Sequence, residues 1–583
     1  MLHTEALHST FYKLSMDIIV SPVIRFLLSG FIMAGVSITA FAQPIITDIS
    51  PRSGPVGSIV TISGSGFLNS ASGNAVFFGT IQGAIVGTPT STSIQVSVPL
   101  GATYGRILVQ SNVTAPPLYA LSNSAFDVTD GSSSCVMTNA SFLPIKNFAI
   151  GSNNPKKGIA RGDLDGDGKA DLVIIENASN LVYVLKNSST TNGAVAFTTG
   201  LTFAGSSTTM TDVAIADLDG DKKPDLIFTN SSAFSITCFR NTSTGIGSIS
   251  FSSAINVTPV ATYQPFALVI GDVDKDGKQD VVIANRANAK ITVLRNTSPV
   301  GSITFSSTVT SIDCGAAPNS VTLADLNEDG KRDIITANSG SNTISLIQNN
   351  STSGAMSFSA AVNVSAGIGS IPQVVINGDM NVDGRMDLIV ASKGTNKISI
   401  FENLGLTSTI STASVGTANE ISMSGSNAPI DIDLGDMNGD GFPDVVVAGQ
   451  IAGNANALSV LRNTHQTGVS AITVTTGVNY STTTNQLDKL ALGDYNLDGR
   501  TDVAISYTTS VPAAGAFISV FQKDVQLTLP DPAGPISGSS PLCSGQSATF
   551  NLDAVAGATN YNWTLLPAHQ SFQEQTQKQL SQI

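Results

Sequence analysis

Charged and aromatic side chains are scarce in this 583-residue chain: charged residues make up 12%, aromatic residues 6%, and Trp occurs once. No run combines Ala, Leu, Glu and Lys at a helical period, which excludes long amphipathic helices. The few charges are mostly acidic, and the net charge is −14. Phosphate backbones would be repelled, so we expect no nucleic-acid partner.

Cysteine and histidine are also few. The four cysteines lie far apart, with no C-x-x-C pair and no metal-ligand spacing, so the fold is not expected to depend on disulfides. Cys238 is interpreted as a small buried hydrophobe, and a bond to Cys314 is not expected. Beyond residue 42 only His465 and His569 remain, and G-x-S-x-G and H-E-x-x-H motifs are absent. The chain is therefore predicted not to be an enzyme.

The N-terminus has the pattern of a secretory signal. Lys13 and Arg25 precede the apolar stretch FLLSGFIMAGVSITAFA, which ends in a small-x-small pattern, so we expect residues 1–42 to be removed after Ala42. An uncleaved anchor is the alternative, and Met16 as initiator would shorten the long n-region. No other stretch is apolar enough to span a membrane. The protein is thus expected to be secreted or at the cell surface, peripheral to a membrane at most.

Against this sparse charge, the nine residues DLDGDGKAD beginning at Asp163 hold four aspartates. Crowded carboxylates repel one another unless a cation lies among them. Acids at positions 1, 3, 5 and 9 with Gly at position 6 match the ligand spacing of a calcium loop. Position 12 is Ile174 in a strand-like run, and no helices flank the loop, which excludes an EF-hand.

The motif occurs seven times in all, with successive first aspartates 54, 55, 53, 54, 57 and 58 residues apart. Four short runs of β-branched residues surround each copy, which predicts propeller blades, with a solenoid as the competing repeat architecture. The seventh repeat lacks its fourth strand. Phe142 precedes Asp163 by the interval at which Phe197, Phe251, Phe305 and Phe358 precede later loops, so residues 141–149 are predicted to complete the last blade.

Each loop is predicted to bind one Ca²⁺, up to seven in all, through side chains at positions 1, 3, 5 and 9 and the backbone carbonyl at position 7. The predicted ligands are Asp163, Asp165, Asp167, Lys169 and Asp171; Asp217, Asp219, Asp221, Lys223 and Asp225; Asp272, Asp274, Asp276, Lys278 and Asp280; Asp325, Asn327, Asp329, Lys331 and Asp333; Asp379, Asn381, Asp383, Arg385 and Asp387; Asp436, Asn438, Asp440, Phe442 and Asp444; and Asp494, Asn496, Asp498, Arg500 and Asp502.

The loops differ at two positions. Loops four to seven have Asn instead of Asp at position 3, which removes a charge and predicts weaker or differently selective sites. Loop two has Lys222 where the turn glycine belongs, and this adds strain and a positive charge. Calcium binding is least expected there.

These repeats resemble the FG-GAP/VCBS family, found in integrin α-subunit propellers and many secreted bacterial proteins. The resemblance implies a seven-bladed propeller at 141–523 with calcium loops on one face. Residues 44–128, through TISGSGF and VPLGATYGRILV, resemble the immunoglobulin-like IPT/TIG domains. Residues 531–583 resemble the start of a PKD-like domain, followed by an irregular Gln-rich tail.

The expected fold is therefore all-β: an N-terminal immunoglobulin-like sandwich, a seven-bladed propeller and a truncated β-sandwich segment. The leading functional hypothesis is a non-catalytic, calcium-binding surface protein for adhesion or recognition, a monomer whose partner is an extracellular protein or glycan. A polysaccharide lyase acting in the central channel and a passive surface scaffold are the alternatives. Tyr263 and Phe266 are candidate exposed contacts for a binder, although Phe266 also fits a core position.

Overall fold

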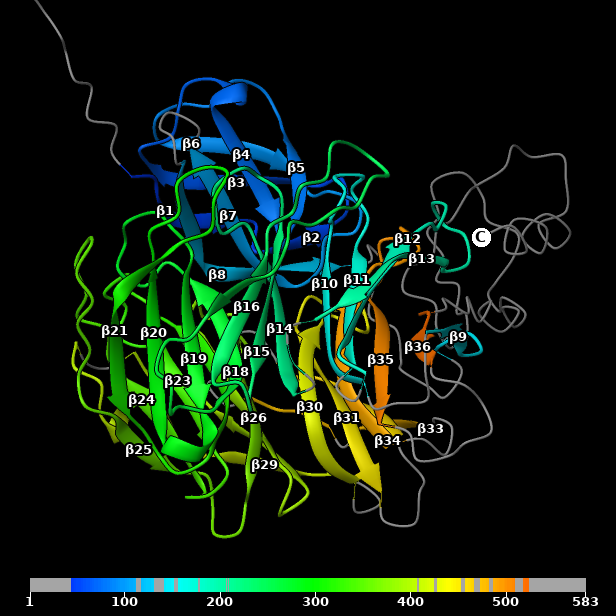
Figure 1. Ribbon diagram of the computed structural model, residues 1–583. Helices are drawn as coiled ribbons and strands as arrows, with labels where there is room; N and C mark the ends of the chain where they lie inside the picture. The colour runs from blue at the N-terminus through cyan, green and yellow to red at the C-terminus, as the bar shows by residue number, and fades with distance from the viewer. Residues whose placement is uncertain are drawn as a thin grey trace, which may run out of the picture. The chain divides into compact units, whose positions relative to one another are not determined.

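Strands make up nearly all the regular structure, as the β-branched composition predicts (Figure 1). The computed structural model describes residues 43–523 with interruptions. Within that range the segments outside the described residues are 112–116, 130–140, 151–155, 177–178, 206, 208, 406–407, 424–426, 452–456, 466–471, 476, 482–485 and 509–516. The predicted signal peptide, Cys135, Cys543 and residues 531–583 also lie outside the described residues. No helix in the described part of the chain is long and apolar enough to cross a membrane.

The first eight strands form a sandwich around an apolar core. They are hydrogen-bonded in the order β1-β3-β6-β5-β4-β7-β8-β2, and β5 pairs with both β4 and β6. Alternate residues such as Ile62, Ile94 and Phe126 are fully buried between the layers. The strands are β1 (Ile45–Ser50), β2 (Ser53–Pro55), β3 (Ile59–Ser65), β4 (Asn74–Phe78), β5 (Ile81–Ile85), β6 (Ser93–Ser97), β7 (Gly105–Ser111) and β8 (Leu118–Thr129), with a 3-10 turn η1 (Ala71–Gly73).

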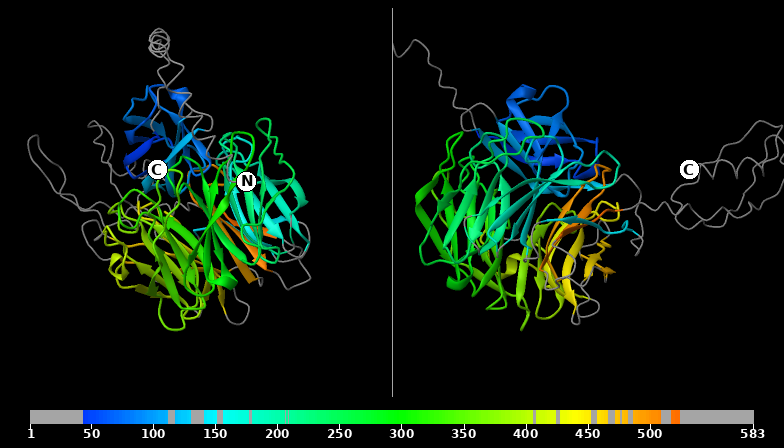
Figure 2. Two further views of the ribbon diagram at one scale, coloured as in Figure 1. Left: turned by 60° about the vertical axis from the view of Figure 1, so that its left-hand side comes forward. Right: turned by 45° about the vertical axis from the view of Figure 1, so that its right-hand side comes forward.

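Seven four-stranded antiparallel sheets follow, one for each predicted repeat (Figures 1 and 2). Blades one to three are β10 (Lys156–Gly162), β11 (Asp171–Glu176), β12 (Leu181–Asn187) and β13 (Phe197–Ala204); β14 (Met210–Ala216), β15 (Asp225–Asn230), β16 (Ser235–Phe239) and β17 (Ile255–Val257); and β18 (Pro265–Gly271), β19 (Asp280–Asn285), β20 (Lys290–Asn296) and β21 (Phe305–Asp313), with η2 (Arg286–Asn288).

Blades four to six are β22 (Pro318–Ala324), β23 (Asp333–Asn338), β24 (Thr343–Ile347) and β25 (Val362–Ser365); β26 (Pro372–Gly378), β27 (Asp387–Ser392), β28 (Lys397–Phe401) and β29 (Asn419–Ser422), with η3 (Thr412–Ser414); and β30 (Asn427–Gly435), β31 (Asp444–Ile451), β32 (Ala457–Leu461) and β33 (Val478–Ser481). Blade seven takes three strands from the C-terminal end of the repeat region and one from its start. They are β34 (Gln486–Gly493), β35 (Asp502–Thr508), β36 (Phe517–Phe521) and β9 (Lys146–Ala149).

The seventh blade confirms the predicted closure. Strand β9 pairs antiparallel with β36, and Phe142 forms an isolated bridge with Lys523. The Phe142 ring packs edge-on against Tyr480 and Phe521, with centroids 4.7 and 5.7 Å apart. Because both ends of the repeat region share one sheet, the ring has no open edge, which excludes the solenoid.

Neighbouring blades are joined by an asparagine at the end of the third strand. In blade three, Asn296 Nδ2 donates to the carbonyl of Leu218 in the preceding blade and of Gln279 in its own, both at 2.8 Å. Asn241, Asn349 and Asn463 make the corresponding pair of bonds, and Asn187 links blade one to Tyr495 of blade seven. Each side chain thus satisfies two buried carbonyls on different blades.

The two free cysteines in the described residues agree with the prediction: Cys238 is fully buried, Cys314 is half-buried, and both are unbridged. Phe266 is half-buried under the Arg286 guanidinium, which lies 4.8 Å from the ring centroid, and Tyr263 is also half-buried.

Candidate metal centres

Every acidic motif forms the loop between the first two strands of a blade. The aspartate at position 9 is the first residue of the second strand in all seven blades. The apolar residue at position 2 is buried in the blade: Leu164 is 1% exposed, and its counterparts are buried likewise. Those counterparts are Leu218, Val273, Leu326, Met380, Met437 and Tyr495. The strand ends and this apolar anchor therefore hold each loop in place.

The aspartate at position 1 organises the turn. Asp163 Oδ1 accepts hydrogen bonds from the backbone N–H groups of Gly166 (2.8 Å) and Asp167 (3.1 Å), and Oδ2 accepts from Gly168 (2.9 Å). The bond from the position-6 N–H recurs in all seven loops at 2.8–3.0 Å. Gly168 has φ +81°, as the turn requires.

Lys222 adopts the same left-handed conformation, with φ +72°, and its N–H still donates to Asp217 Oδ2 at 2.9 Å. This conformation costs a non-glycine residue about 1–2 kcal/mol. Its side chain is exposed. Loop two therefore keeps the geometry of the other loops, and the predicted strain is present.

The position-9 aspartate is completely buried and accepts two backbone hydrogen bonds. Asp171 Oδ1 accepts from Asn187 N at 2.8 Å, and Oδ2 accepts from Leu164 N at 3.0 Å. The same pair of bonds is present in the other six loops. Burial raises the pKa of Asp171 to about 8 in spite of these bonds. A charge at this position is thus costly without a cation nearby.

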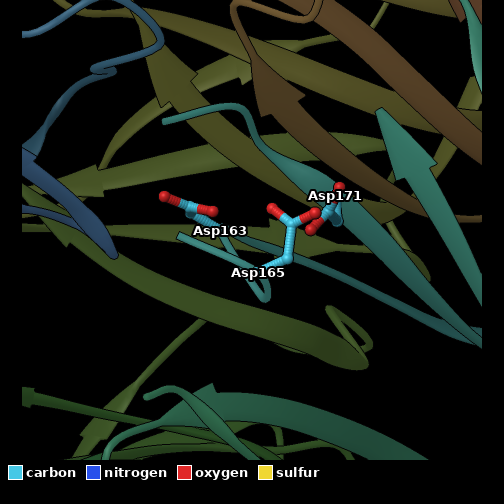
Figure 3. Close-up of side chains that lie close together, drawn as sticks. All are labelled: Asp163, Asp165 and Asp171. Atoms are coloured by element: carbon cyan, nitrogen blue, oxygen red, sulfur yellow. The ribbon is translucent and has the colours of Figure 1, made fainter. Parts of the chain in front are cut away.

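Carboxylates converge in the first three loops. Oxygen atoms of Asp163, Asp165 and Asp171 lie within 4.8 Å of one another (Figure 3). The oxygen atoms of Asp217, Asp219 and Asp225 do so in loop two. In loop three the group comprises Asp272, Asp274 and Asp276. Burial raises the pKa of Asp163 to about 6 and that of Asp272 to about 7. Buried, mutually repelling oxygen donors of this kind fit a hard cation.

Asparagine at position 3 preserves the loop geometry. Asn327, Asn381, Asn438 and Asn496 each accept the N–H of the position-5 aspartate at 2.9–3.3 Å, as Asp165 does at 3.2 Å. The N–H of position 7 donates to the position-5 carboxylate in all seven loops, at 2.8–3.0 Å. Loops four to seven thus present an oxygen at position 3 as loops one to three do.

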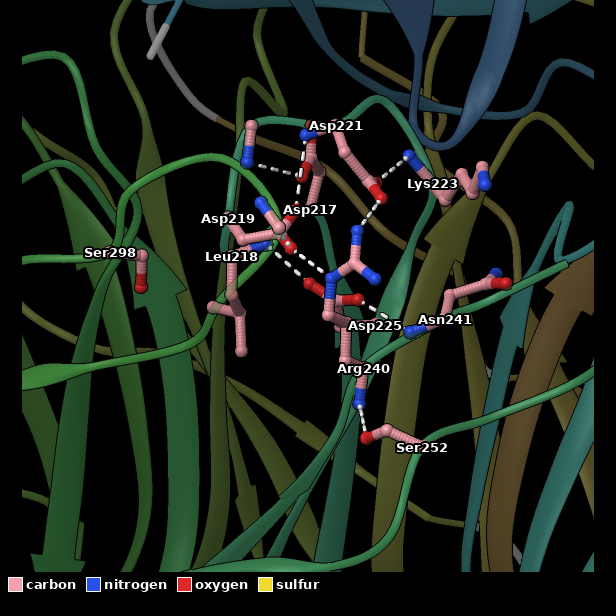
Figure 4. A network of polar contacts seen from close by, with 12 residues as sticks. Asp217, Leu218, Asp219, Asp221, Lys223, Asp225, Arg240, Asn241, Ser252 and Ser298 are labelled. Carbon is pink, nitrogen blue, oxygen red and sulfur yellow. Dashed lines mark hydrogen bonds and ion pairs between the residues drawn. The ribbon is translucent and has the colours of Figure 1, made fainter. Parts of the chain in front are cut away.

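Basic side chains on the third strands contact loops one to three, and sequence reasoning missed them. Lys186 forms an ion pair with Asp165, and Arg240 pairs with Asp219 and Asp221 (Figure 4). Arg295 Nε lies 2.6 Å from Asp274 Oδ2, and Arg295 Nη2 lies 2.6 Å from Asp276 Oδ2. All three bases follow position 3 by 21 residues, whereas the Asn loops four and five have Gln348 and Glu402 there.

This pairing changes the comparison between loops. The first three loops have four carboxylates and one base, and the Asn loops four and five have three carboxylates and no base at the same place. With the base included, the net charge of loops one to three is similar to that of loop four, whereas Glu402 adds a carboxylate beside loop five. Weaker or differently selective calcium binding by the Asn loops stays a prediction.

The third-to-fourth strand loop of the following blade contacts the same acids. Gly247 N donates to Asp165 Oδ2 at 3.0 Å, and Gly301 N donates to Asp219 Oδ2 at 3.1 Å. Asn327 Nδ2 donates to the carbonyl of Ser408 at 2.9 Å. Each of these sites is therefore built from two adjacent blades.

The sandwich contacts the propeller at these loops, within one compact unit of the chain. Tyr119 donates its hydroxyl proton to Asp217 Oδ2 at 2.8 Å, and Gln43 Nε2 donates to Asp272 Oδ2 at 3.2 Å. Backbone N–H groups of Asp163 and Asp379 donate to Thr80 Oγ1 (2.9 Å) and to the hydroxyl of Tyr104 (3.0 Å). The remaining three first-position aspartates interact electrostatically or through the backbone with the sandwich: Asp325 with Arg106, Asp436 with Asp127, and Asp494 with Gly101.

The fold and its loops define the class: a seven-bladed β-propeller with acidic loops at one end of its blades and an immunoglobulin-like sandwich against them. FG-GAP-like repeats match residues 163–228, 217–283, 272–336, 379–447 and 436–505, which together cover more than half of the sequence. The chain belongs to the FG-GAP-like repeat family. An IPT/TIG domain matches residues 44–129, and a PKD-like domain matches 529–581. The PKD-like match extends to residue 581 and so includes the Gln-rich segment, which has no strand-like alternation of apolar residues.

No curated protein matches the sequence. Among solved structures, an auxiliary nutrient binding protein from Bacteroides thetaiotaomicron is similar over 80% of this chain and 98% of its own, with 9% identity and a TM-score of 0.31. A putative phosphatase from the same organism has 10% identity and a TM-score of 0.31, covering 81% and 98%. A functionally unknown protein from Desulfotomaculum acetoxidans has 13% identity and a TM-score of 0.35, covering 72% and 96%.

Proposed function

We propose that this protein is a secreted or cell-surface recognition module whose propeller is stabilised by calcium in its seven loops, and that it has no catalytic activity. The observation that carries the proposal is the shared loop geometry. In every loop the same backbone hydrogen bonds to positions 1, 5 and 9 fix the turn, and in loops one to three the oxygens of three aspartates converge within 4.8 Å.

Calcium suits these donors because it prefers oxygen ligands in flexible arrangements. In loop one the ion would be held by Asp163, Asp165, Asp167 and Asp171 with the carbonyl of Lys169. It would neutralise buried carboxylates and hold the turn. Lys186 would remain on the outer oxygen of Asp165, where it is paired already. The role supported by these residues is structural.

The energetic effect of such ions is large when summed. Extracellular calcium modules have Kd values of about 10⁻⁴ to 10⁻³ M. A site with a Kd of about 0.1 mM adds about 1.4 kcal/mol at roughly 1 mM calcium. Seven such sites would add on the order of 10 kcal/mol, which is comparable with the whole stability of a domain.

Recognition is assigned to the face opposite the acidic loops, because the sandwich forms hydrogen bonds at six of the seven first-position aspartates. The second-to-third strand turns and the connections between blades lie at that other end. They carry exposed apolar side chains: Phe234 is 38% exposed, Ile368 100% and Ile371 43%. These side chains are available for apolar contact with an extracellular protein or glycan partner.

A lyase in the channel would need a base there. Lys489 is buried and pairs with Asp431 at 3.1 Å, and nearby Asp431 and Asp212 raise its pKa despite the burial. A lysine held protonated cannot accept a proton from a substrate. Lys489 is therefore not assigned as the base of such a lyase.

The test is thermal unfolding of the secreted chain in metal-free buffer with calcium or magnesium added, together with metal counting by mass spectrometry. We expect a large calcium-dependent rise in Tm and up to seven bound ions, with a smaller effect of magnesium, which tolerates irregular sites poorly. An unchanged Tm with no bound metal would contradict the calcium proposal. Glycan and cell-surface binding screens of the loaded protein would then test recognition, and turnover of a polysaccharide would refute the non-catalytic assignment.

A further inference from the structure

Two arginines line a partly open cavity between the sandwich and the propeller. Arg106 belongs to strand β7 of the sandwich, and Arg332 immediately precedes strand β23 of blade four. Both line a cavity of about 220 Å³, together with Tyr104 and Asn377. They also line an adjoining cavity of about 460 Å³. The site therefore takes one guanidinium from each domain.

Neither guanidinium is paired. In the described part of the chain no carboxylate lies within ion-pair distance of Arg106 or Arg332, and Arg106 Nη2 is buried without a hydrogen-bond partner. Burial lowers the pKa of Arg106 to about 10. Arg332 lines the same two cavities as Arg106. Two like charges are thus held together in a desolvated place, which is unfavourable without a counter-charge.

The surrounding backbone leaves room for these groups. At Gly271 on β18 a β-carbon would lie 3.0 Å from Arg332 Nη1, and at Gly378 on β26 it would lie 2.9 Å from the Tyr104 hydroxyl. That hydroxyl accepts the Asp379 N–H, and burial raises the pKa of Tyr104, so its proton remains available to donate into the cavity. Donors from three side chains therefore converge on one space.

The acids near the cavity are engaged elsewhere. Asp433 shares its lining, but its carboxylate accepts the N–H groups of Leu434 and Leu492, and Arg161 opposes the rise of its pKa. Asp272 and Asp325 act on the arginines only at longer range and accept hydrogen bonds from their own loops. An external anion is the group that this arrangement lacks.

We propose that this cavity binds a small oxyanion, a carboxylate or a sulfate-like ion, between the Arg106 and Arg332 guanidiniums. A planar guanidinium presents parallel N–H donors that match two oxygens of such an ion. Because one arginine comes from each domain, the bound anion bridges sandwich and propeller. Arg332 belongs to the fourth acidic loop, but its guanidinium is not one of the predicted calcium ligands, and the anion proposal does not require calcium to be bound.

The experiment is calorimetric titration of the full secreted chain with sodium sulfate and, separately, sodium succinate, against sodium chloride at equal ionic strength. Titrations are run in metal-free buffer and again with calcium. This separates a failure of the anion proposal from a failure of the calcium proposal. Saturable binding of one ion per chain is expected, and the two salts distinguish an inorganic oxyanion from a carboxylate. Arg106→Gln and Arg332→Gln should each weaken it by about tenfold or more.

Two further measurements keep the result interpretable. Arg286→Gln removes an exposed guanidinium stacked on Phe266 and should leave anion affinity unchanged. In chloride, Arg106→Gln should be at least as stable to heat as the wild type, because an uncompensated buried charge is removed. Absence of saturable binding, or equal affinity in the wild type and both arginine variants, would overturn the proposal.

Discussion

At the scale of single residues, the position-9 aspartate has two roles. Its two oxygens accept backbone N–H groups from the preceding loop and from the end of the third strand, and in loops one and two the carboxylate also belongs to the convergent acidic group. Both N–H groups are buried, so the loss of either acceptor leaves an unsatisfied donor and costs free energy of folding. The carboxylate therefore holds the blade together whether or not a metal is present.

Asp171→Asn tests this dual role. An amide can replace only one of the two acceptor oxygens, so we expect a loss of about 2 kcal/mol even in metal-free buffer. Urea unfolding with and without calcium measures it. The control is Asp313→Asn, since Asp313 is 85% exposed in its pair with Lys290 and should change stability by less than about 0.5 kcal/mol. If Asp171→Asn matched the wild type without metal, the carboxylate would serve the cation alone.

At the scale of elements, the blades are joined by side chains as well as by apolar packing. The third-strand asparagine bonds carbonyls of two blades in five of the junctions described above. Blade five differs: Asn403 Nδ2 has no hydrogen-bond partner in the described structure. Its Oδ1 accepts the N–H of Gly405, as Asn296 Oδ1 accepts that of Ser298.

This difference supplies a matched pair of variants. Asn296→Ala leaves two buried carbonyls without donors, whereas Asn403→Ala loses only the bond that both asparagines share. We expect Asn296→Ala to be less stable than Asn403→Ala by about 2 kcal/mol. Differential scanning calorimetry of both variants in the same buffer measures this, and equal shifts in Tm would show that the junction bonds contribute nothing.

At the scale of the whole molecule, the acidic loops set a pH dependence. Burial raises the pKa of Asp171, Asp225, Asp280 and Asp387 to about 8, from an ordinary value of 3.8. A carboxyl whose pKa is raised by folding stabilises the folded state only while it is protonated. Its contribution is complete below the ordinary value and is lost as the pH rises through the folded value.

We therefore expect the metal-free protein to lose stability as the pH is raised from about 4 to about 8. Calcium should reverse or flatten this trend, because the ion favours the charged form of its ligands and binds better as they ionise. Urea midpoints at stepped pH values, with and without calcium, measure both curves. A metal-free midpoint that stays constant or rises over this range would contradict the assigned shifts.

Much of the fold is local in origin and could be predicted. Nine residues of sequence contain everything that shapes a loop: a turn glycine such as Gly168, an apolar anchor such as Leu164, and the aspartates. The repetition of this nine-residue motif predicts the blades. Ring closure was also predictable, because Phe142 precedes the first acidic loop by the same number of residues as the fourth-strand phenylalanines precede the later loops. The bases Lys186, Arg240 and Arg295 were detectable in principle by their constant spacing from position 3, although their contacts depend on how the third strand pairs.

The sequence by itself therefore determined the seven-bladed ring and the oxygen donors of each loop, since both depend on short-range spacing. The tertiary structure alone decided which distant side chains meet those loops. Arg106 lies more than two hundred residues from Arg332, and Tyr119 nearly a hundred from Asp217. No local pattern relates such residues, because their approach depends on packing the sandwich against the ring.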